Sequence, residues 1–200
     1  LAWRVAQRPG LRVPGAWDGF ELAIRDILGQ PITVHAAVLL AGTLAAPYGE
    51  RLPEALAQEG LTVAFPSPQR LAAADLSGLP MPGARSRSLG SMAAAAVADP
   101  ALFGPRQDLD TAIKALKALP GIGEWTAQYI AMRALREPDA FPHADIGLMR
   151  ALEDAEGKRP TPLELLARAE RWRPWRAYAA SHLWAHDAAT DPTISKDQKH

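Results

Sequence analysis

Cysteine is absent from the 200-residue chain. This absence excludes a disulfide scaffold, a thiolate nucleophile, a cysteine-ligated zinc site and an iron–sulfur cluster held by cysteines. Long apolar runs are also missing, and the first residues, LAWRVAQRPG, lack the pattern of a secretion signal. We therefore expect a cytoplasmic protein with no membrane partner. The formal net charge is zero, so a nucleic-acid partner would need a local basic face.

The hydrophobic content of 48% is dominated by alanine and leucine, and clusters of β-branched residues are rare. This composition predicts an all-α fold, a compact bundle of short helices. Asp18 is expected to cap a helix that runs to Leu28, and Pro31 suits the first turn of the next helix, which Pro47 ends. Further helices are expected from Ser67-Pro68, over about 84–98, 109–119 and 124–135, after Asp145, and across TPLELLARAERW and RPWRAYAASHLWAHDAA. The candidate strands are short, in RVAQRPGLRVPG and LTVAF.

The stretch LPGIGEWTAQYI, residues 119–130, joins two amphipathic segments through a turn with two glycines. Glycine permits backbone conformations that a Cβ atom penalises. The turn amides and the start of the following helix predict a concave phosphate site, made by Gly121, Ile122, Gly123 and Thr126. Contact through the backbone carries no base-sequence information. An ordinary packing corner between two helices explains the same glycines, so both interpretations stay open here.

A carboxylate follows in the stretch FPHADIGLMRAL, where Asp145 begins a helix. Such a carboxylate can stabilise the cationic sugar that forms while a glycosidic bond breaks. The simpler interpretation is a helix N-cap, a common position for aspartate. Asp139 and His143 are nearby rivals: Asp139 is expected in a solvated loop, and His143 at a pocket edge or on the surface.

Several aromatic residues can belong either to a core or to a binding slot. Trp125 and Tyr129 are four residues apart and share one helix face, and Trp184 lies on the last helix. Such residues usually pack in a core, but they also suit a slot in which a flipped base stacks between rings. The stretch RWRPWR contributes Arg171, Arg173 and Arg176, expected as a solvated basic strip.

Hairpin and aspartate together resemble the helix-hairpin-helix DNA glycosylase superfamily, and more closely the bacterial DNA-3-methyladenine glycosylase II family. The similar stretches are RPGLRVPGAWDGFELAIRDILGQ, FPSPQRLAAAD, LPMPGARSRSL, LPGIGEWTAQYIAMRAL, FPHADIGLMRAL and RWRPWRAYAASHLW. The resemblance implies the DNA glycosylase fold and excision of alkylated purines, of the 3-methyladenine and 7-methylguanine type, from damaged double-stranded DNA. It implies base excision repair that leaves an abasic site, in a bacterial cytoplasm at the nucleoid. We expect a monomer, because no oligomerisation motif stands out in the sequence.

The resemblance also implies roles for single residues. Asp145 stands where the family has its catalytic aspartate, and Gly121 and Gly123 stand in its phosphate-binding hairpin. The positions that match the family's aromatic base pocket are Trp125, Tyr129 and Trp184.

Two further features are implied in the same way. Gln30 and Pro31 lie in the family's loop that approaches the opened duplex. The backbone carbonyls of Lys117, Leu119 and Ile122 match a weak Na⁺ or K⁺ site that bridges to a DNA phosphate. No other cofactor is expected.

The chain departs from the family pattern at three places. Pro31 stands where relatives often have a bulky apolar residue, and Ala144 where they often have an acidic one. Superfamily members that also cut the DNA backbone carry a lysine at the position of Trp125, so we expect no lyase activity. The family's N-terminal β-rich domain is expected to be largely absent, with residues 1–14 a remnant or linker, 15–188 the glycosylase domain and 189–200 a polar tail.

Three alternatives remain at this stage. A non-catalytic helix-hairpin-helix DNA-binding module predicts salt-sensitive DNA binding without base release. A glycosylase for mismatched or oxidised bases predicts a different lesion range. A purely structural helical domain predicts no DNA binding.

Overall fold

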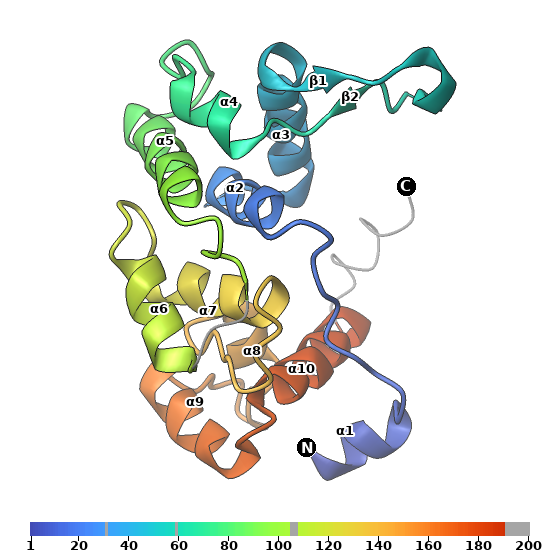
Figure 1. Cartoon of the computed structure of the whole chain (residues 1–200). Coiled ribbons are helices and arrows are strands. Elements are labelled where there is room, and N and C mark those ends of the chain that lie inside the picture. The colour runs from blue at the N-terminus through green and yellow to red at the C-terminus, as the bar shows by residue number, and fades with distance from the viewer. Residues whose placement is uncertain (31, 59, 105–107, 191–200) are drawn as a thin grey trace.

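The computed structural model describes residues 1–30, 32–58, 60–104 and 108–190 of the chain (Figure 1). Pro31 and residues 191–200 of the expected polar tail lie outside the described residues. Helices dominate the regular structure of the described part, and its one two-stranded sheet is a small antiparallel hairpin that pairs Glu50 with Ala64 and Arg51 with Val63. The expectation of an all-α bundle is therefore confirmed.

The helices and strands follow one another along the chain with short connections. They are α1 (Ala2–Gln7), α2 (Gly19–Gly29), α3 (Val34–Tyr48), β1 (Glu50–Arg51), η1 (Glu54–Leu56), β2 (Val63–Ala64), α4 (Pro68–Ala73), α5 (Gly83–Ala98), α6 (Leu109–Lys117), α7 (Glu124–Arg133), α8 (Ile146–Arg150), α9 (Pro162–Ala169), η2 (Glu170–Trp172) and α10 (Arg176–Thr190).

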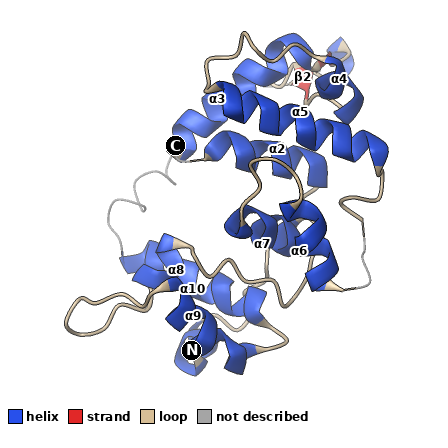
Figure 2. Cartoon of the chain, turned by 90° about the vertical axis from the view of Figure 1, so that its left-hand side faces the viewer, coloured by secondary structure: helices blue, strands red, loops and turns tan. Residues whose placement is uncertain are grey.

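The elements form two halves, with α7 between them. Helices α2–α5 and the β-hairpin make the upper half in Figure 1, and α6, α8–α10 and α1 lie below (Figure 1). Helix α2 packs against α3, α5 and α7, while α6 packs on α7 and α8 on α10. Figure 2 shows the same division from the side. Because α7 contacts α2 of the upper half and α6 of the lower half, its residues can reach groups from both halves.

Local sequence explains most helix starts. Side-chain oxygens of Asp18, Ser67 and Asp108 accept hydrogen bonds from backbone amides at the starts of α2, α4 and α6. At α9, Thr161 and Glu164 form a reciprocal capping box. The apolar faces of these helices bury one continuous core, whose largest fully buried side chains include Phe141, Ile24, Leu28, Met92, Leu116 and Ile130. Among the described residues no helix is both long enough and apolar enough to cross a bilayer.

Two expectations about secondary structure are wrong. The third helix begins at Val34, capped by Thr33, and continues through Pro47 to Tyr48. Pro47 lacks the N–H that would donate to the Thr43 carbonyl, so the helix loses one hydrogen bond just before its end. The first segment, expected as strand material, contains helix α1, which Arg4 anchors by donating to the Ala151 carbonyl at 2.8 Å. The other candidate strand, LTVAF, contains β2 as expected.

Candidate active site

The hairpin between α6 and α7 projects at the left edge of Figure 1. Gly121 has φ +78°, and a Cβ atom built there would lie 2.0 Å from Ser88 Oγ on α5. Both facts require glycine at this position. The Ile122 amide donates to the Leu119 carbonyl at 3.2 Å and closes the turn, and the Ile122 side chain is buried in the core. Two contacts thus fix the hairpin: the Ile122 side chain is buried in the core, and Gly121 packs against Ser88 of α5.

Gly123 differs from Gly121. It has φ −85° and ψ 177°, which any residue adopts, and a Cβ atom there would meet nothing within 4 Å. The sequence-based expectation that the backbone needs glycine here is therefore wrong. The missing side chain instead leaves the backbone beside the start of α7 uncovered, as close approach of a ligand requires.

The start of α7 carries no side-chain cap, whereas Asp145 caps the start of α8. The first amides of an uncapped helix have no intrahelical partner, and the helix dipole places partial positive charge there. Beside this end, Lys117 Nζ lies 2.5 Å from Glu124 Oε2 and ties the last turn of α6 to the first of α7. The hairpin therefore has the backbone chemistry of an anion site.

Asp145 is at once a helix cap and the centre of a polar cluster. Its Oδ1 accepts hydrogen bonds from the Leu148 amide at 2.9 Å and from Trp184 Nε1 at 2.8 Å. Its Oδ2 accepts from Trp125 Nε1 at 2.9 Å. The structure confirms that Asp145 caps α8. A helix cap alone does not explain why indole N–H groups from two other helices, α7 and α10, also donate to this carboxylate.

The three aromatic residues singled out from the sequence lie together around this carboxylate. Trp125 and Tyr129 stack with ring centroids 5.1 Å apart and an interplanar angle of 10°. Tyr129 and Trp184 meet edge to face at 6.3 Å. The structure therefore brings Asp145, Trp125, Tyr129 and Trp184 into one cluster at the junction of α7, α8 and α10.

Charged neighbours surround the Tyr129 hydroxyl. Arg133 donates to it at 2.8 Å, and the Arg133 guanidinium lies 5.3 Å from the ring centroid. Burial raises the Tyr129 pKa, Arg133 opposes that rise, and the negative charges of Asp26 and Asp145 add to it. Tyr129 therefore stays a neutral phenol at physiological pH, and its ring offers a flat face next to a carboxylate.

A carboxyl group on α2, that of Asp26, lies at the contact between α2 and α7. The sequence analysis did not single out this residue. Burial raises the pKa of Asp26 to about 7, and the influence of the Thr126 hydroxyl partly opposes that rise. Thr126, also buried, accepts from Gln30 Nε2 at 3.0 Å. Arg85 on α5 donates to the Gln30 carbonyl. Thr126, expected in the phosphate hairpin, thus faces α2, and Gln30 is held by α5 and α7.

Gly147 is another residue that the sequence analysis missed. A Cβ atom there would lie 3.1 Å from Asp145 Oδ1, 3.2 Å from Asp187 Oδ2 and 3.4 Å from Trp184 Cδ1. Arg150 donates to both oxygens of Asp187 at 2.6 Å and fixes that carboxylate. The Asp-Ile-Gly order of the sequence was the available signal, because glycine in a helix is unfavourable unless close packing requires it.

The rivals of Asp145 have other roles in the structure. Asp139 is not solvated loop: its Oδ1 accepts from Arg176 Nε at 2.8 Å, and Arg173 binds its Oδ2. Arg176 is buried, so the expectation of a solvated strip is wrong for this residue. The reason is pairing between segments far apart in sequence, which neutralises charges that look exposed. His143 is half-buried next to Glu124.

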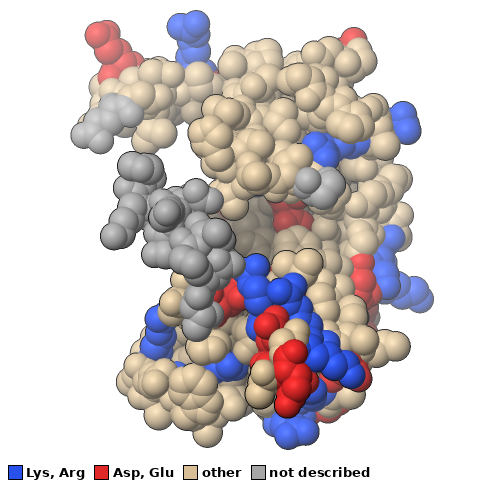
Figure 3. All heavy atoms as spheres, turned by 180° about the vertical axis from the view of Figure 1, so that it is seen from behind, with Lys and Arg blue, Asp and Glu red and all other residues tan. Residues whose placement is uncertain are grey.

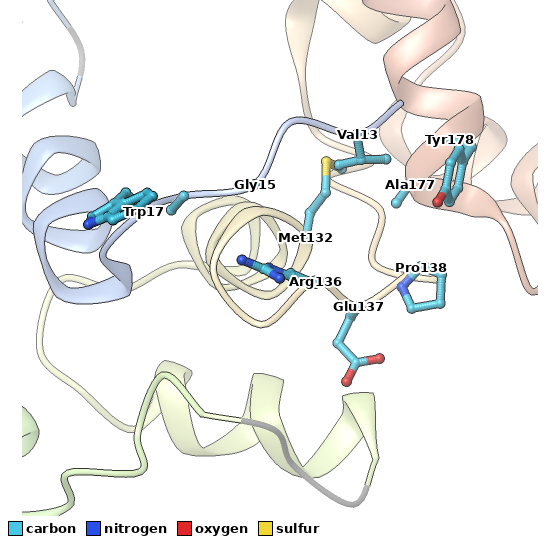
Figure 4. A pocket seen from close by; sticks show the side chains of 10 residues that line it. Val13, Gly15, Trp17, Met132, Arg136, Glu137, Pro138, Ala177 and Tyr178 are labelled. Atoms are coloured by element: carbon cyan, nitrogen blue, oxygen red, sulfur yellow. The ribbon is translucent and has the colours of Figure 1, made fainter. Parts of the chain in front are cut away.

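The exposed surface does not mark the site by charge alone. Figure 3 shows a hollow between the two halves, with acidic atoms visible inside it and basic and acidic groups mixed below it. A separate cavity of about 770 Å³ contains none of the aromatic cluster. In Figure 4, Trp17 and Tyr178 lie on its opposite sides, with Arg136 and Glu137 between them.

Fold and site together define a class: the chain has the fold of the helix-hairpin-helix DNA glycosylases. The solved structure of a Schizosaccharomyces pombe 3-methyladenine DNA glycosylase in complex with abasic DNA matches 91% of this chain and 88% of its own. The TM-score is 0.69 at 22% sequence identity, which establishes the fold. No family model matches the chain.

Curated proteins similar in sequence point to one family within the helix-hairpin-helix DNA glycosylases. The chain is 41% identical over 185 residues to DNA-3-methyladenine glycosylase 2 of Escherichia coli strain K12, a match that covers 90% of this chain and 61% of the relative. It is 39% identical over 180 residues to a probable bifunctional transcriptional activator/DNA repair enzyme, AlkA, of Mycobacterium tuberculosis, covering 90% of this chain and 36% of that protein. The resemblance to the DNA-3-methyladenine glycosylase II family is therefore confirmed, and the chain spans less than two thirds of these relatives' length.

Metal ligands of the usual kind are not gathered anywhere in the described ranges, which contain no cluster of three or more histidine, aspartate or glutamate side chains. The carbonyl site expected at Lys117, Leu119 and Ile122 is of a different kind. The Leu119 carbonyl accepts the Ile122 amide at 3.2 Å, and a carbonyl oxygen has a second lone pair, so this bond does not block a monovalent cation.

Proposed function

We propose that this chain is the catalytic part of a monofunctional DNA glycosylase that removes alkylated purines from duplex DNA and leaves an abasic site. The observation that supports the proposal best is the geometry of Asp145, a carboxylate held by the indole N–H groups of Trp125 and Trp184 beside the stacked ring of Tyr129. A pocket for a flat base and a group for a cationic sugar then adjoin each other.

The hairpin holds the DNA backbone in this proposal. A phosphate beside the lesion binds the uncapped amides at the start of α7, which Gly123 leaves uncovered. The contact fixes the position of the DNA without reading its sequence. A Na⁺ or K⁺ ion held by the carbonyls of Lys117, Leu119 and Ile122 adds positive charge at the same phosphate.

The aromatic cluster selects the base. Alkylation at N3 or N7 gives a purine a positive charge, and electron-rich rings such as Trp125 and Tyr129 attract a cation that lies over their faces. The damaged pair is also weakened, which lowers the cost of flipping the nucleotide out of the helix. The positive charge makes the purine a good leaving group, so the reaction needs no strong general acid.

Asp145 acts on the sugar. As the bond from C1′ to the base nitrogen breaks, its electron pair leaves with the base and positive charge develops on the sugar ring. Oδ1 already accepts two hydrogen bonds and Oδ2 one, so Oδ2 keeps a lone pair for the sugar or for the attacking water. Water adds to C1′ and loses a proton to Asp145 or to solvent.

Further features of the proposal follow from the same residues. Trp125 occupies the position at which lyase-active members of the superfamily carry a lysine, so no Schiff base forms and the DNA backbone stays intact. The reaction needs no organic cofactor. We place the protein in the bacterial cytoplasm, acting as a monomer at the nucleoid.

The test compares wild type with Asp145→Asn on methylated duplex DNA and measures released 3-methyladenine and 7-methylguanine. Asparagine is also a good N-cap, so α8 should still form. We expect the variant to release base about 10²–10³-fold more slowly, while DNA affinity is equal or higher because a negative charge is lost. Glu153→Gln, an exposed carboxylate paired with Arg159, serves as the matched control and should act like wild type.

Other outcomes favour other functions. Because Asp145 is a real cap of α8, a non-catalytic DNA-binding module is the second candidate. DNA binding without base release by the wild type would support that module. Release by Asp145→Asn at the wild-type rate would show that Asp145 is only a cap.

A further inference from the structure

The last residue of α8, Arg150, is joined to α10 by a pair of parallel hydrogen bonds. Its Nε donates to Asp187 Oδ1 and its Nη2 donates to Asp187 Oδ2, both at 2.6 Å, and Asp187 is buried. A buried ion pair is often no more stable than apolar residues of similar size. Two parallel hydrogen bonds do, however, fix the orientation of the two groups. The pair therefore calls for an explanation in terms of geometry.

The other end of α8 is joined to the same helix. Asp145, the N-cap of α8, accepts from Trp184 Nε1 at 2.8 Å through its Oδ1. Trp184 and Asp187 are three residues apart on α10, so they lie on one face of that helix. Helix α8 therefore contacts this face at both its ends, through Asp145 at the start and through Arg150 at the finish.

Helix α8 has few other contacts that could fix its direction. It has five residues, fewer than two turns, and of these Leu148 is buried. A helix this short is not stable by itself and depends on tertiary contacts. With a contact only at its start, α8 could rotate about that point, whereas contacts at both ends hold its direction. Arg4 also reaches the far end of α8, but it comes from α1 and binds the Ala151 carbonyl, so it does not join α8 to α10.

The middle of α8 brings two carboxylates close to each other. A Cβ atom at Gly147 would lie 3.1 Å from Asp145 Oδ1 and 3.2 Å from Asp187 Oδ2. Two negative charges that lie next to one backbone position repel each other. The guanidinium of Arg150 compensates the charge of Asp187, so that this second carboxylate does not push Asp145 away from its indole donors.

We propose that Arg150 is a positioning residue: through Asp187 it fixes α8 against α10, and so holds the Asp145 carboxylate at the Trp184 indole. The inference rests on the proposed function for one point, that this carboxylate assists the breaking of the bond to the base. Arg150 then governs the rate of base release and not the affinity for DNA. The position of Asp145 itself can be followed without DNA.

The main test removes both members of the pair at once. Arg150→Met alone would leave the buried Asp187 carboxylate without its guanidinium, and such a protein can fail to fold. Arg150→Met combined with Asp187→Leu removes both charges and puts apolar side chains in their place, so this double variant should melt close to the wild-type temperature. It nevertheless lacks the two hydrogen bonds. A pair that only stabilises the fold and a pair that positions Asp145 therefore predict different behaviour.

The first measurement follows the indole N–H groups by nuclear magnetic resonance on isotope-labelled protein without DNA. The chain has six tryptophans, and Trp125→Phe and Trp184→Phe identify the two signals of interest. In the double variant we expect both signals to shift, because their common acceptor, Asp145, has moved. The signals of Trp17 and Trp175, which lie outside the aromatic cluster, should stay in place.

The second measurement is single-turnover release of 7-methylguanine from methylated duplex DNA, with the dissociation constant for DNA measured alongside. A misplacement of 1 Å can cost about 10²-fold in rate, and we expect the smaller shift here to slow release by the double variant about tenfold. The dissociation constant should stay near the wild-type value, because the hairpin is unchanged. Arg150→Lys keeps the positive charge but not the paired donors, so its rate should lie between those of wild type and the double variant.

Asp139→Asn is the matched control. Asp139 pairs with Arg176 at the start of α10, and the side chains of Arg176 and Asp187 are equally buried, each 6% exposed. The variant weakens a buried ion pair of the same helix without touching α8. It should lower the melting temperature, but it should leave the two indole signals and the rate per folded molecule unchanged.

A wild-type rate in the double variant would overturn the inference, and so would unchanged indole signals. A loss of DNA affinity as large as the loss of rate would also overturn it, because Arg150 would then be a DNA contact. Wild-type protein that binds DNA but releases no base would refute the proposed function instead. The indole signals would in that case still decide whether Arg150 positions Asp145.

Discussion

Gly147→Ala tests whether the position of Asp145 matters to within a fraction of an ångström. Gly147 is the second residue of α8, and the added methyl carbon would lie 3.1 Å from Asp145 Oδ1 and 3.2 Å from Asp187 Oδ2. Asp187 cannot retreat easily, because Arg150 holds both its oxygens at 2.6 Å. The crowding should therefore displace Asp145 by a few tenths of an ångström, whereas Trp184, 3.4 Å from the methyl carbon, is at ordinary van der Waals distance.

The effects on stability and on rate should differ. Alanine is about 1 kcal/mol better than glycine within a helix, and modest overpacking costs about 1–3 kcal/mol. The free energy of unfolding should then fall by no more than about 2 kcal/mol. A misplacement of 1 Å in a catalytic constellation can cost about 10²-fold in rate, so a shift of a few tenths should slow excision about three- to tenfold.

The assay is single-turnover release of methylated purine at saturating enzyme, with thermal unfolding of the same preparations. Gly42→Ala is the matched control, because Gly42 lies within α3 and a Cβ atom there meets nothing within 4 Å. The control should gain about 1 kcal/mol and keep the wild-type rate. A Gly147→Ala protein that excises as fast as wild type would refute the reasoning about Asp145.

The remaining predictions concern the hairpin and the buried carboxyl group. Gly121→Ala combines φ +78° with a clash against Ser88, so we expect a fall of several degrees in melting temperature together with lost DNA affinity; an unchanged melting curve would contradict this. Gly123→Ala should fold like wild type, yet bind DNA more weakly in a titration, because its methyl group stands on the open face of the hairpin. For Asp26, burial raises the pKa from 3.8 to about 7. Over that interval the folded state keeps a proton that the unfolded chain has released, so stability falls as pH rises, on the order of 4 kcal/mol in total. Asp26→Asn should lose this slope, and denaturant titrations between pH 5 and 8 will show whether its advantage over wild type grows with pH up to about 7.

Much of the fold could be predicted because the signals are local. Asp18 and Ser67 each cap a helix from a position next to it, and the hairpin places its glycines within one turn. The same holds for Asp145 as the start of α8, since its capping bond reaches only to Leu148. Within such short ranges the chain has few ways to satisfy its backbone, and sequence patterns suffice.

The parts that could not be predicted depend on residues far apart in the chain. Asp139 looked solvated because its partners Arg173 and Arg176 follow more than thirty residues later; the two hydrogen-bonded pairs are 34 and 37 residues apart. Asp26 was missed for the same reason, since only the packing of α2 on α7 buries its carboxyl group. Neither composition nor periodicity records such pairings, which arise when helices pack.

Helix α7 contributes to both of the proposed DNA contacts, the phosphate at the hairpin and the flipped base at the aromatic cluster. Its uncapped amides begin at Gly123, and its ring face extends to Tyr129 within the same ten-residue helix. At a rise of about 1.5 Å per residue, these two points are about 9 Å apart along the axis. The helix is continuous between them, so the distance from the hairpin amides to the Tyr129 ring is fixed. It sets a fixed spacing between a gripped phosphate and a flipped base, and a nucleotide can be tested for damage only when its backbone is held at that spacing.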